Sequence, residues 1–265
     1  MRFSKYFCNN ESVGKLLSQF PQSQGPLFHY TDQSASIGIR GGEVRMTRAD
    51  CFLDQSEIVH GLAVLSEAAQ TTFKAKERES FSIVLKALEA RLHACFVLSL
   101  SQDRDNNHLK STYAQKNGAI LEFQEGFPMI FYGASWHTIP NGNDSWSVRF
   151  IVDLYEFFEG FVIYDVARQL HLAEMACQSY RDIRSTDAHP ADIYHFIDIL
   201  MRCMVLFKVP SFNAEKEYRF ALIRNLGDVQ SFEETMAHNG KHRAYISVRI
   251  PSTDAEIICV RDVQS

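Results

Sequence analysis

Several features that define specialised protein classes are missing from this chain of 265 residues. No run approaches the ~18 consecutive apolar residues that a membrane-spanning helix needs. Residues 1–12 lack the apolar core of a secretory signal. There is no Gly-rich phosphate loop and no Gly-x-Ser-x-Gly nucleophile turn. We therefore expect a soluble, cytoplasmic protein without a membrane partner and without either of these catalytic motifs.

Metal-ligand spacing is also missing. The six cysteines are scattered, and no two have the short separation of a zinc site. Cys95 and Cys259 lie within apolar runs, where cysteine behaves as a small hydrophobic residue. His238 and His242 are four residues apart, but the Asn239-Gly240 pair between them interrupts a helix. The sequence predicts no metal site, no disulfide framework and a reducing compartment.

Charge is nearly balanced. The chain has 27 basic and 32 acidic residues, a formal net charge of −5 and 46% hydrophobic residues. This composition is typical of a globular protein and excludes a disordered chain. It also argues against a protein that grips nucleic acid with its whole surface, although a local basic groove remains possible.

Strands and helices are interleaved without a regular βαβ rhythm. Patterning predicts strands over residues 27–30, 43–47, 95–100, 118–123, 161–164, 218–223, 244–250 and 256–261. It predicts helices from a cap at Thr31 or Asp32 to Gly41, and over residues 56–93, 167–180 and 190–207, with residues 101–117 as a polar loop. The last three strands have no helices between them, which favours an α+β fold. We predict an N-terminal extension and loop (1–26) and one α+β domain (27–265) with a mixed or antiparallel sheet and helical insertions.

Three polar groups are candidates for chemistry. They are His29-Tyr30-Thr31, Ser111-Thr112-Tyr113 and residues 212–219. In the third group, the two-residue period of a strand predicts that Glu215, Glu217 and Arg219 share one face. Each group taken alone is also typical of ordinary structure, such as a helix cap or a solvated charged strand face.

Taken in order, these groups resemble a bacterial family known as domain of unknown function 2971. The resemblance extends from residue 27 to about residue 263. It rests on Phe28-His29-Tyr30-Thr31, Asp54, Glu57, Phe96 to Ser101, Tyr113, Gly118, Phe123, Val162-Ile163-Tyr164, Phe207-Lys208, Phe212, Glu215, Glu217, Tyr218 and Arg219. Members of that family are in turn similar to the NAD-dependent ADP-ribosyltransferases.

This second resemblance implies an ADP-ribosyltransferase-like fold and an enzyme that uses NAD to modify a macromolecule. The acceptor would be a protein or a nucleic acid, and the setting a bacterial toxin or phage defence. His29 and Thr31 match the first motif of those enzymes, Ser111-Thr112-Tyr113 the second, and Glu217 the third. Glu215 would be the first acid of a Glu-x-Glu pair.

The chemistry of NAD cleavage gives these residue types complementary roles. Breaking the nicotinamide–ribose bond creates an oxocarbenium-like centre, which the carboxylate of Glu217 would stabilise. His29 would bind a ribose hydroxyl, and Tyr113 would stack on nicotinamide. Glu215 would accept the proton of the acceptor nucleophile. Further candidate contacts to NAD are Tyr30, Thr31, Arg45 and Arg219; for the pyrophosphate, the alternatives are Arg219, Arg45 and Lys208.

Two departures from the family pattern leave other interpretations open. Lys110 stands where the family usually has Trp, and Leu53 where it tends to have Asn. A pocket altered in this way would suit a module that senses a nucleotide or nucleic acid by binding alone. A third alternative is a protein-interaction domain in which the polar motifs are structural.

Overall fold

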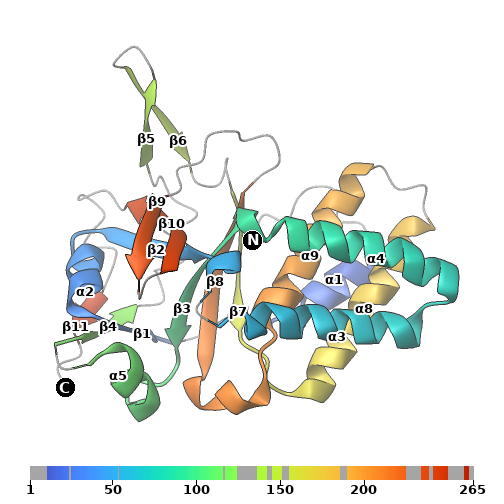
Figure 1. Ribbon diagram of the computed structural model, residues 1–265, viewed down its shortest axis with the longest axis horizontal. Helices are drawn as coiled ribbons and strands as arrows, with labels where there is room; N and C mark the ends of the chain where they lie inside the picture. The colour runs from blue at the N-terminus through green and yellow to red at the C-terminus, as the bar shows by residue number, and fades with distance from the viewer. Residues whose placement is uncertain are drawn as a thin grey trace. The chain divides into compact units, whose positions relative to one another are not determined.

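The computed structural model describes residues 11–23, 25–52, 54–115, 117–123, 136–141, 145–150, 155–185, 190–224, 234–238, 241–249 and 260–262. The chain forms two compact units from interleaved segments (Figure 1). The helical unit comprises Met1–Gln22, Leu53–His93 and Gly160–Asn213, and the sheet unit comprises Ser23–Phe52, Ala94–Glu159 and Ala214–Ser265. Helices combined with an antiparallel sheet confirm the mixed α+β class. The predicted domain boundaries stay a prediction.

The helical unit contains five α-helices among its described residues. They are α1 (Glu11–Leu17), α3 (Ser56–Thr72), α4 (Ala75–Ala90), α8 (Val166–Arg184) and α9 (Pro190–Leu206). The helical stretch predicted over residues 56–93 is divided into α3 and α4, and Phe81, Val84 and Leu88 are the buried residues of α4. Helix α1 lies in the segment predicted as extension and loop, although Val13 and Leu16 are fully buried. None of these helices is both long and apolar enough to cross a bilayer.

Aromatic rings and one glycine organise the core of the helical unit. Phe81 packs against Phe73 and Tyr180 with ring centroids 5.2 Å apart in each pair. Helices α3 and α9 approach closely at Gly61, where an added Cβ would lie 2.6 Å from the carbonyl oxygen of Met204. The absence of a side chain at Gly61 therefore permits this helix packing.

Replacing Gly61 by alanine tests this close approach. We expect G61A to lower the free energy of unfolding by about 1–3 kcal/mol, because the methyl group overpacks a backbone contact. In α1, Gly14 has open space around its Cα, so G14A is expected to be neutral or to stabilise by up to about 1 kcal/mol. Urea unfolding of both variants measures the difference, and equal stabilities would contradict the packing.

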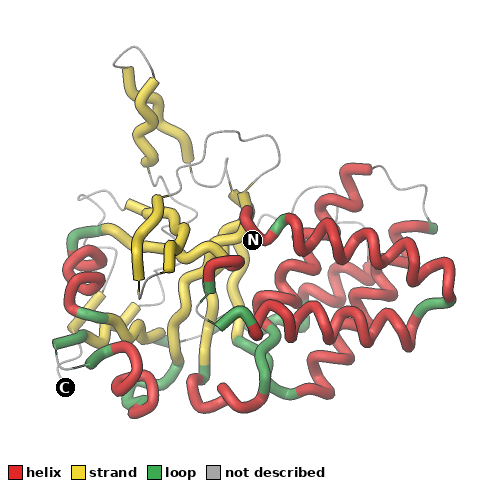
Figure 2. Tube along the Cα trace, in the orientation of Figure 1, coloured by secondary structure: helices red, strands yellow, loops and turns green. Residues whose placement is uncertain are grey.

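The sheet unit is built around strand β3. Its strands are β1 (Leu27–Thr31), β2 (Glu43–Arg48), β3 (Cys95–Ser101), β4 (Ala119–Phe123), β7 (Tyr155–Phe161), β8 (Glu217–Arg224), β9 (Glu234–His238), β10 (Lys241–Arg249) and β11 (Val260–Asp262), with β5 (Trp136–Asn141) and β6 (Ser145–Phe150) forming a separate hairpin. Figure 2 colours these strands yellow. Strand β8 pairs antiparallel with all seven residues of β3. On the other edge of β3, β2 pairs with Phe96 and Val97, and β1 pairs with Ser101.

The register assigns the side chains to two faces, because directly opposed residues in an antiparallel ladder point the same way. Thr47 opposes Val97, and Val97 opposes Ala221, so Arg45 and Arg219 share a face. The opposite face is apolar and buried, with Val44, Met46, Phe96, Leu98, Leu100, Tyr218, Phe220, Leu222, Ile246 and Val248. This apolar face forms the core of the sheet unit, and polar side chains collect on the face of Arg45 and Arg219.

Two short α-helices lie among the described residues of the sheet unit. Helix α2 (Gln33–Arg40) begins after Asp32, whose carboxylate accepts from the backbone N–H of Ala35, so of the two predicted caps, Thr31 and Asp32, the structure has Asp32. Helix α5 (Asn107–Tyr113) lies within the stretch predicted as a polar loop, and that prediction is wrong. The helix forms because Asn106 caps it and Leu109 is buried against Phe28, Tyr30 and Ile120.

Two predicted strands need comment. Strand β7 ends at Phe161, so the strand predicted over residues 161–164 is wrong beyond its first residue. Beyond it, Ile163 makes an isolated parallel bridge to Phe207. Most of the strand predicted over 256–261 lies outside the described residues, which include β11 (Val260–Asp262).

Candidate functional site

A buried ion pair occupies the start of β8. The guanidinium of Arg219 donates from Nε to Oε1 of Glu217 (2.7 Å) and from Nη2 to Oε2 (2.9 Å). Both side chains are almost inaccessible, with 6% of Glu217 and 2% of Arg219 exposed. The ring of Phe52 lies 5.3 Å from the guanidinium carbon. Paired charge-assisted bonds of this kind fix the orientation of the carboxylate.

Glu215 is arranged differently from Glu217. It ends the 3₁₀ helix η3 (Pro210–Glu215), whereas β8 begins only at Glu217. Between them, Lys216 has a φ of 46°, in the left-handed region that non-glycine residues seldom adopt. The strand alternation predicted for Glu215 is therefore wrong, because the two-residue period starts after it. The alternation of Glu217 and Arg219 is confirmed by their ion pair.

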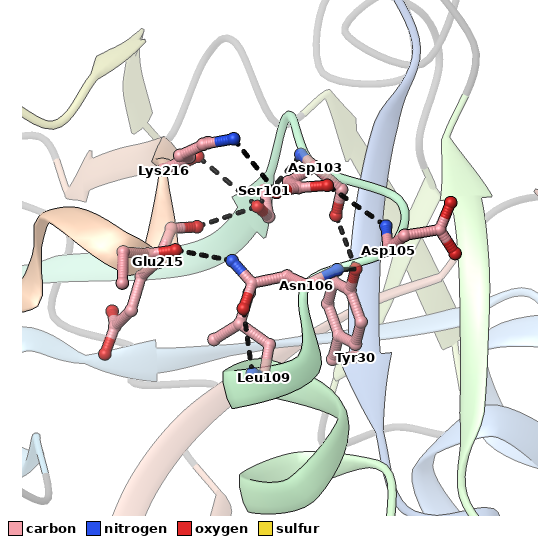
Figure 3. A network of polar contacts seen from close by, with 9 residues as sticks. Tyr30, Ser101, Asp103, Asp105, Asn106, Leu109, Glu215 and Lys216 are labelled. Carbon is pink, nitrogen blue, oxygen red and sulfur yellow. Dashed lines mark hydrogen bonds and ion pairs between the residues drawn. The ribbon is translucent and has the colours of Figure 1, made fainter.

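The segment Ala214–Lys216 is held by a second segment, Ser101–Asn106 (Figure 3). The hydroxyl of Ser101 donates to the carbonyl oxygen of Glu215 (2.7 Å), and Nδ2 of Asn106 donates to that of Ala214 (2.5 Å). Both Ser101 and Asn106 are buried. We call these two segments and the bonds between them the 101–216 clamp.

Lys216 joins the clamp through its backbone and its side chain. Its carbonyl oxygen accepts from the N–H of Gln102 (3.2 Å), and its Nζ lies 3.0 Å from Oδ2 of Asp103. The ammonium of Lys216 lowers the pKa of Asp103 below its usual value. These contacts hold the left-handed backbone at Lys216 in place.

Tyr30 supports the same clamp from β1. Its hydroxyl donates to the carbonyl oxygen of Asp103 and accepts from the backbone N–H of Asn106 (3.0 Å). The ring is buried, and desolvation raises the pKa of the Tyr30 phenol. Tyr30 was predicted to contact NAD, and in the structure its hydroxyl binds the loop that precedes α5.

His29 lies on a different side of β1 from Tyr30. Phe28 opposes Ser101, and Ser101 opposes Glu217, so Phe28 and Glu217 share a sheet face. The side chain of His29, the next residue along β1, leaves the backbone on the opposite face. The half-buried ring donates from Nδ1 to the carbonyl oxygen of Ser99 (2.9 Å), because a carbonyl can only accept. Desolvation lowers the pKa of His29, and the bond to Ser99 opposes this shift.

The depressed pKa of His29 predicts an acid-dependent loss of stability. The fold favours neutral His29, so its contribution is fully present above the unfolded pKa of 6.5 and is lost as pH falls below it. We expect the wild type to lose more free energy of unfolding than H29Q between about pH 8 and pH 5. Urea unfolding at both pH values measures this difference, and parallel losses would contradict it.

The remaining candidates are distributed over the sheet unit. Thr31 is buried at the end of β1, and Tyr113 ends helix α5 with 44% of its surface exposed. Ser111 and Thr112 donate to the carbonyl oxygen of His108 within that helix. The second motif therefore lies on a helix. Helix α5 packs through Leu109 against Phe28 and Tyr30, so it lies over the sheet face that Phe28 shares with Glu217.

Arg45 does lie on the face of Glu217. Its Nε donates to Oε1 of Glu43 (2.9 Å), and its guanidinium carbon is 5.0 Å from the ring centroid of Tyr245. Of the two departures from the family pattern, Lys110 forms an ion pair with Asp105 (3.2 Å). Leu53 lies outside the described residues.

Lys208, the third candidate cation, belongs to the helical unit. Its Nζ lies 3.1 Å from Oε1 of Glu57 and 4.7 Å from the centre of the Phe212 ring. Gln169 anchors this position by donating from Nε2 to the carbonyl oxygens of Ile163 (2.5 Å) and Lys208 (2.8 Å). The buried ammonium is thus balanced by a carboxylate within its own unit.

The helical unit also has an open cavity of about 430 Å³ at the first turn of α8. Its lining includes Phe161, Tyr164, Arg168 and Asn213. The volume is within the range of small-molecule sites. None of the candidate NAD-binding or catalytic residues is among its lining residues, and all of these candidates except Lys208 belong to the sheet unit.

The residues of the clamp were missed from the sequence. Ser101 ends an apolar strand, and Asn106 has the residue type of a helix N-cap, so a signal for α5 was present. Their contacts with residues 214–216 join positions more than 100 residues apart, which local patterning does not reveal.

The left-handed backbone at Lys216 predicts an unusual preference for glycine. Both K216G and K216A lose the bond to Asp103, but glycine adopts a positive φ without steric cost. We expect K216G to equal or exceed K216A in free energy of unfolding, by up to about 1 kcal/mol. At Lys110, inside helix α5, the order should reverse, with alanine favoured by about 1 kcal/mol. Thermal and urea unfolding of the four variants decide the matter, and an alanine preference at both positions contradicts the backbone geometry.

Comparison with known proteins identifies no similar protein. No protein-family model, curated protein or solved structure matches the chain. The resemblance to the family of unknown function and to ADP-ribosyltransferases therefore stays a prediction.

Proposed function

We propose that the sheet unit holds a nucleotide site of the ADP-ribosyltransferase type and that the protein uses NAD to modify a macromolecule. The observation that carries the proposal is the buried carboxylate of Glu217, fixed at the start of β8 on the polar sheet face. Arg219 and Arg45 lie on the same face and provide cationic groups for a pyrophosphate. An ADP-ribosyltransferase-like arrangement of the strands is part of this proposal.

In the proposed reaction, nicotinamide leaves with the electron pair of its bond to the ribose carbon C1′. The carboxylate of Glu217 stabilises the positive charge that develops on the sugar. The acceptor nucleophile then forms a bond to C1′ and loses its proton to a base, the role assigned to Glu215. A fixed carboxylate supports the first step, because a preorganised charge needs no reorientation as the reaction proceeds.

Two assignments from the resemblance have weaker support. A ribose contact by His29 requires its imidazole on the sheet face of Glu217. The strand register places the Cβ of His29 on the opposite face. Stacking by Tyr113 needs the end of α5 to reach the nucleotide. The proposal therefore rests on Glu217, Arg219 and Arg45. A protein or nucleic-acid acceptor and a toxin or phage-defence setting rest on the resemblance alone.

A second candidate function is nucleotide binding without transfer. It is favoured by one observation, that both oxygens of Glu217 accept bonds from Arg219. A carboxylate neutralised in this way stabilises a cationic sugar less effectively than one with a free oxygen. Under this alternative the polar face senses a nucleotide or a nucleic acid.

Nicotinamide release tests the transferase proposal. We expect purified wild-type protein to release nicotinamide from NAD and E217Q to release it at least about 100-fold more slowly, because an oriented charge is lost. Removing one member of a buried ion pair typically destabilises a protein by about 3–5 kcal/mol. Loss of folding therefore has to be separated from loss of chemistry.

D198N is the matched control for E217Q. Asp198 forms a buried bidentate pair with Arg91 in the helical unit (2.5 and 3.1 Å). D198N should lose comparable stability yet release nicotinamide at the wild-type rate per folded molecule. Equal release by the wild type and E217Q would remove Glu217 from the mechanism. Calorimetry with NAD, ADP-ribose and a short RNA then separates the two functions, since binding without product supports sensing.

A further inference from the structure

The backbone just before Glu217 has an unfavourable conformation, which hydrogen bonds from the segment Ser101–Asn106 hold in place. Lys216 has a positive φ of 46°, a conformation that is sterically unfavourable for any residue with a Cβ. Such a conformation persists only where surrounding contacts determine it, and it concentrates at functional sites. The carbonyl groups of Ala214, Glu215 and Lys216 all accept bonds from Ser101–Asn106. Glu217 follows this fixed segment directly.

The clamping loop is itself held on its other side. Tyr30 bonds to both Asp103 and Asn106, and Oδ1 of Asn106 accepts from the N–H of Leu109 at the start of α5. Asn106 therefore serves two segments with its two amide atoms. Oδ1 caps the helix, and Nδ2 reaches the segment before β8. In Figure 3, the side chain of Asn106 lies between Leu109 and the segment before β8.

We propose that Ser101 and Asn106 are positioning residues that hold Glu217 in its reactive geometry; this inference rests on the proposed function. They act through the backbone of residues 214–216, so they need no contact with a nucleotide. The carbonyl carbon of Lys216 is bonded to the backbone nitrogen of Glu217 in one planar peptide group, so a shift of that carbonyl reorients the first residue of β8. Displacements of about 1 Å in a reacting group lower rates by up to about 100-fold.

The variant N106D isolates this role. The carboxylate keeps an oxygen for the N–H of Leu109 but loses the donor to Ala214, so helix capping is retained and the clamp is broken. N107D is the matched control, because the exposed neighbour Asn107 receives the same change and the same charge at the same helix end. S101A provides a second, smaller change that removes the donor to Glu215.

Nicotinamide release from NAD and hydrogen exchange of the amides of residues 214–219 are measured on the four proteins. We expect N106D and S101A to lower kcat by about tenfold or more with KM within about twofold of the wild type. Amide exchange should be faster in both variants, and N107D should match the wild type in every measurement. A purely structural role would lower the folded fraction and leave kcat per folded molecule unchanged.

The possible outcomes distinguish a failure of the positioning role from a failure of the proposed transferase function. Wild-type turnover with an unchanged kcat in N106D and S101A overturns the positioning role and leaves the transferase intact. Unchanged amide exchange in both variants shows that the contacts do not fix the segment, which also overturns the inference. No nicotinamide release by the wild type overturns the proposed function, and with it the reaction that the clamp would serve.

Discussion

Strand β3 is the constraint on which the sheet unit depends, because three strands form hydrogen bonds with it. Strand β8 covers one edge along its full length, whereas β1 and β2 share the other edge. This pairing decides which side chains face the apolar core and which gather on the polar face. It also places Ser101, the last residue of β3, opposite Glu217, the first residue of β8. The candidate site therefore begins where the central strand ends.

Buried charge is the second theme of the structure. Each unit contains a nearly inaccessible ion pair, Glu217 with Arg219 in one and Glu57 with Lys208 in the other. Burying two charges is costly, so such pairs need fixed geometry and further polar contacts. Both pairs have this support from neighbouring backbone, through the clamp beside Glu217 and through Gln169 beside Lys208. Only the first pair lies on the polar face of a sheet, which is why the proposed chemistry is assigned there.

Local patterning predicted most elements that have a clear period or cap. The strand predicted over residues 43–47 is β2, the helical stretch predicted over 56–93 contains α3 and α4, and one of the two predicted caps, Asp32, precedes α2. The short helices α1 and α5 were missed, because seven residues contain too little periodicity. Strand alternation does not extend to Glu215, because the backbone at Lys216 is left-handed and β8 begins only at Glu217. A left-handed residue interrupts the two-residue period of a strand, and a lysine at that position gives no sequence signal for it.

In the candidate site, too, local sequence predicts some features, and others depend on contacts between distant segments. Close spacing sufficed to place Glu217 and Arg219 on one face, since residues two apart on a strand point the same way, and their ion pair agrees with this. Whether His29 and Tyr113 accompany them depended on register and on the path of the chain, which are set by contacts between distant segments. Ser101 and the carbonyl of Glu215 are 114 residues apart, yet their bond shapes the start of β8. The sequence by itself determines the residue types and the local period of each strand and helix, because these depend on neighbouring residues. The order of the strands, the 101–216 clamp and the burial of the ion pairs depend on packing between segments that are far apart in the chain.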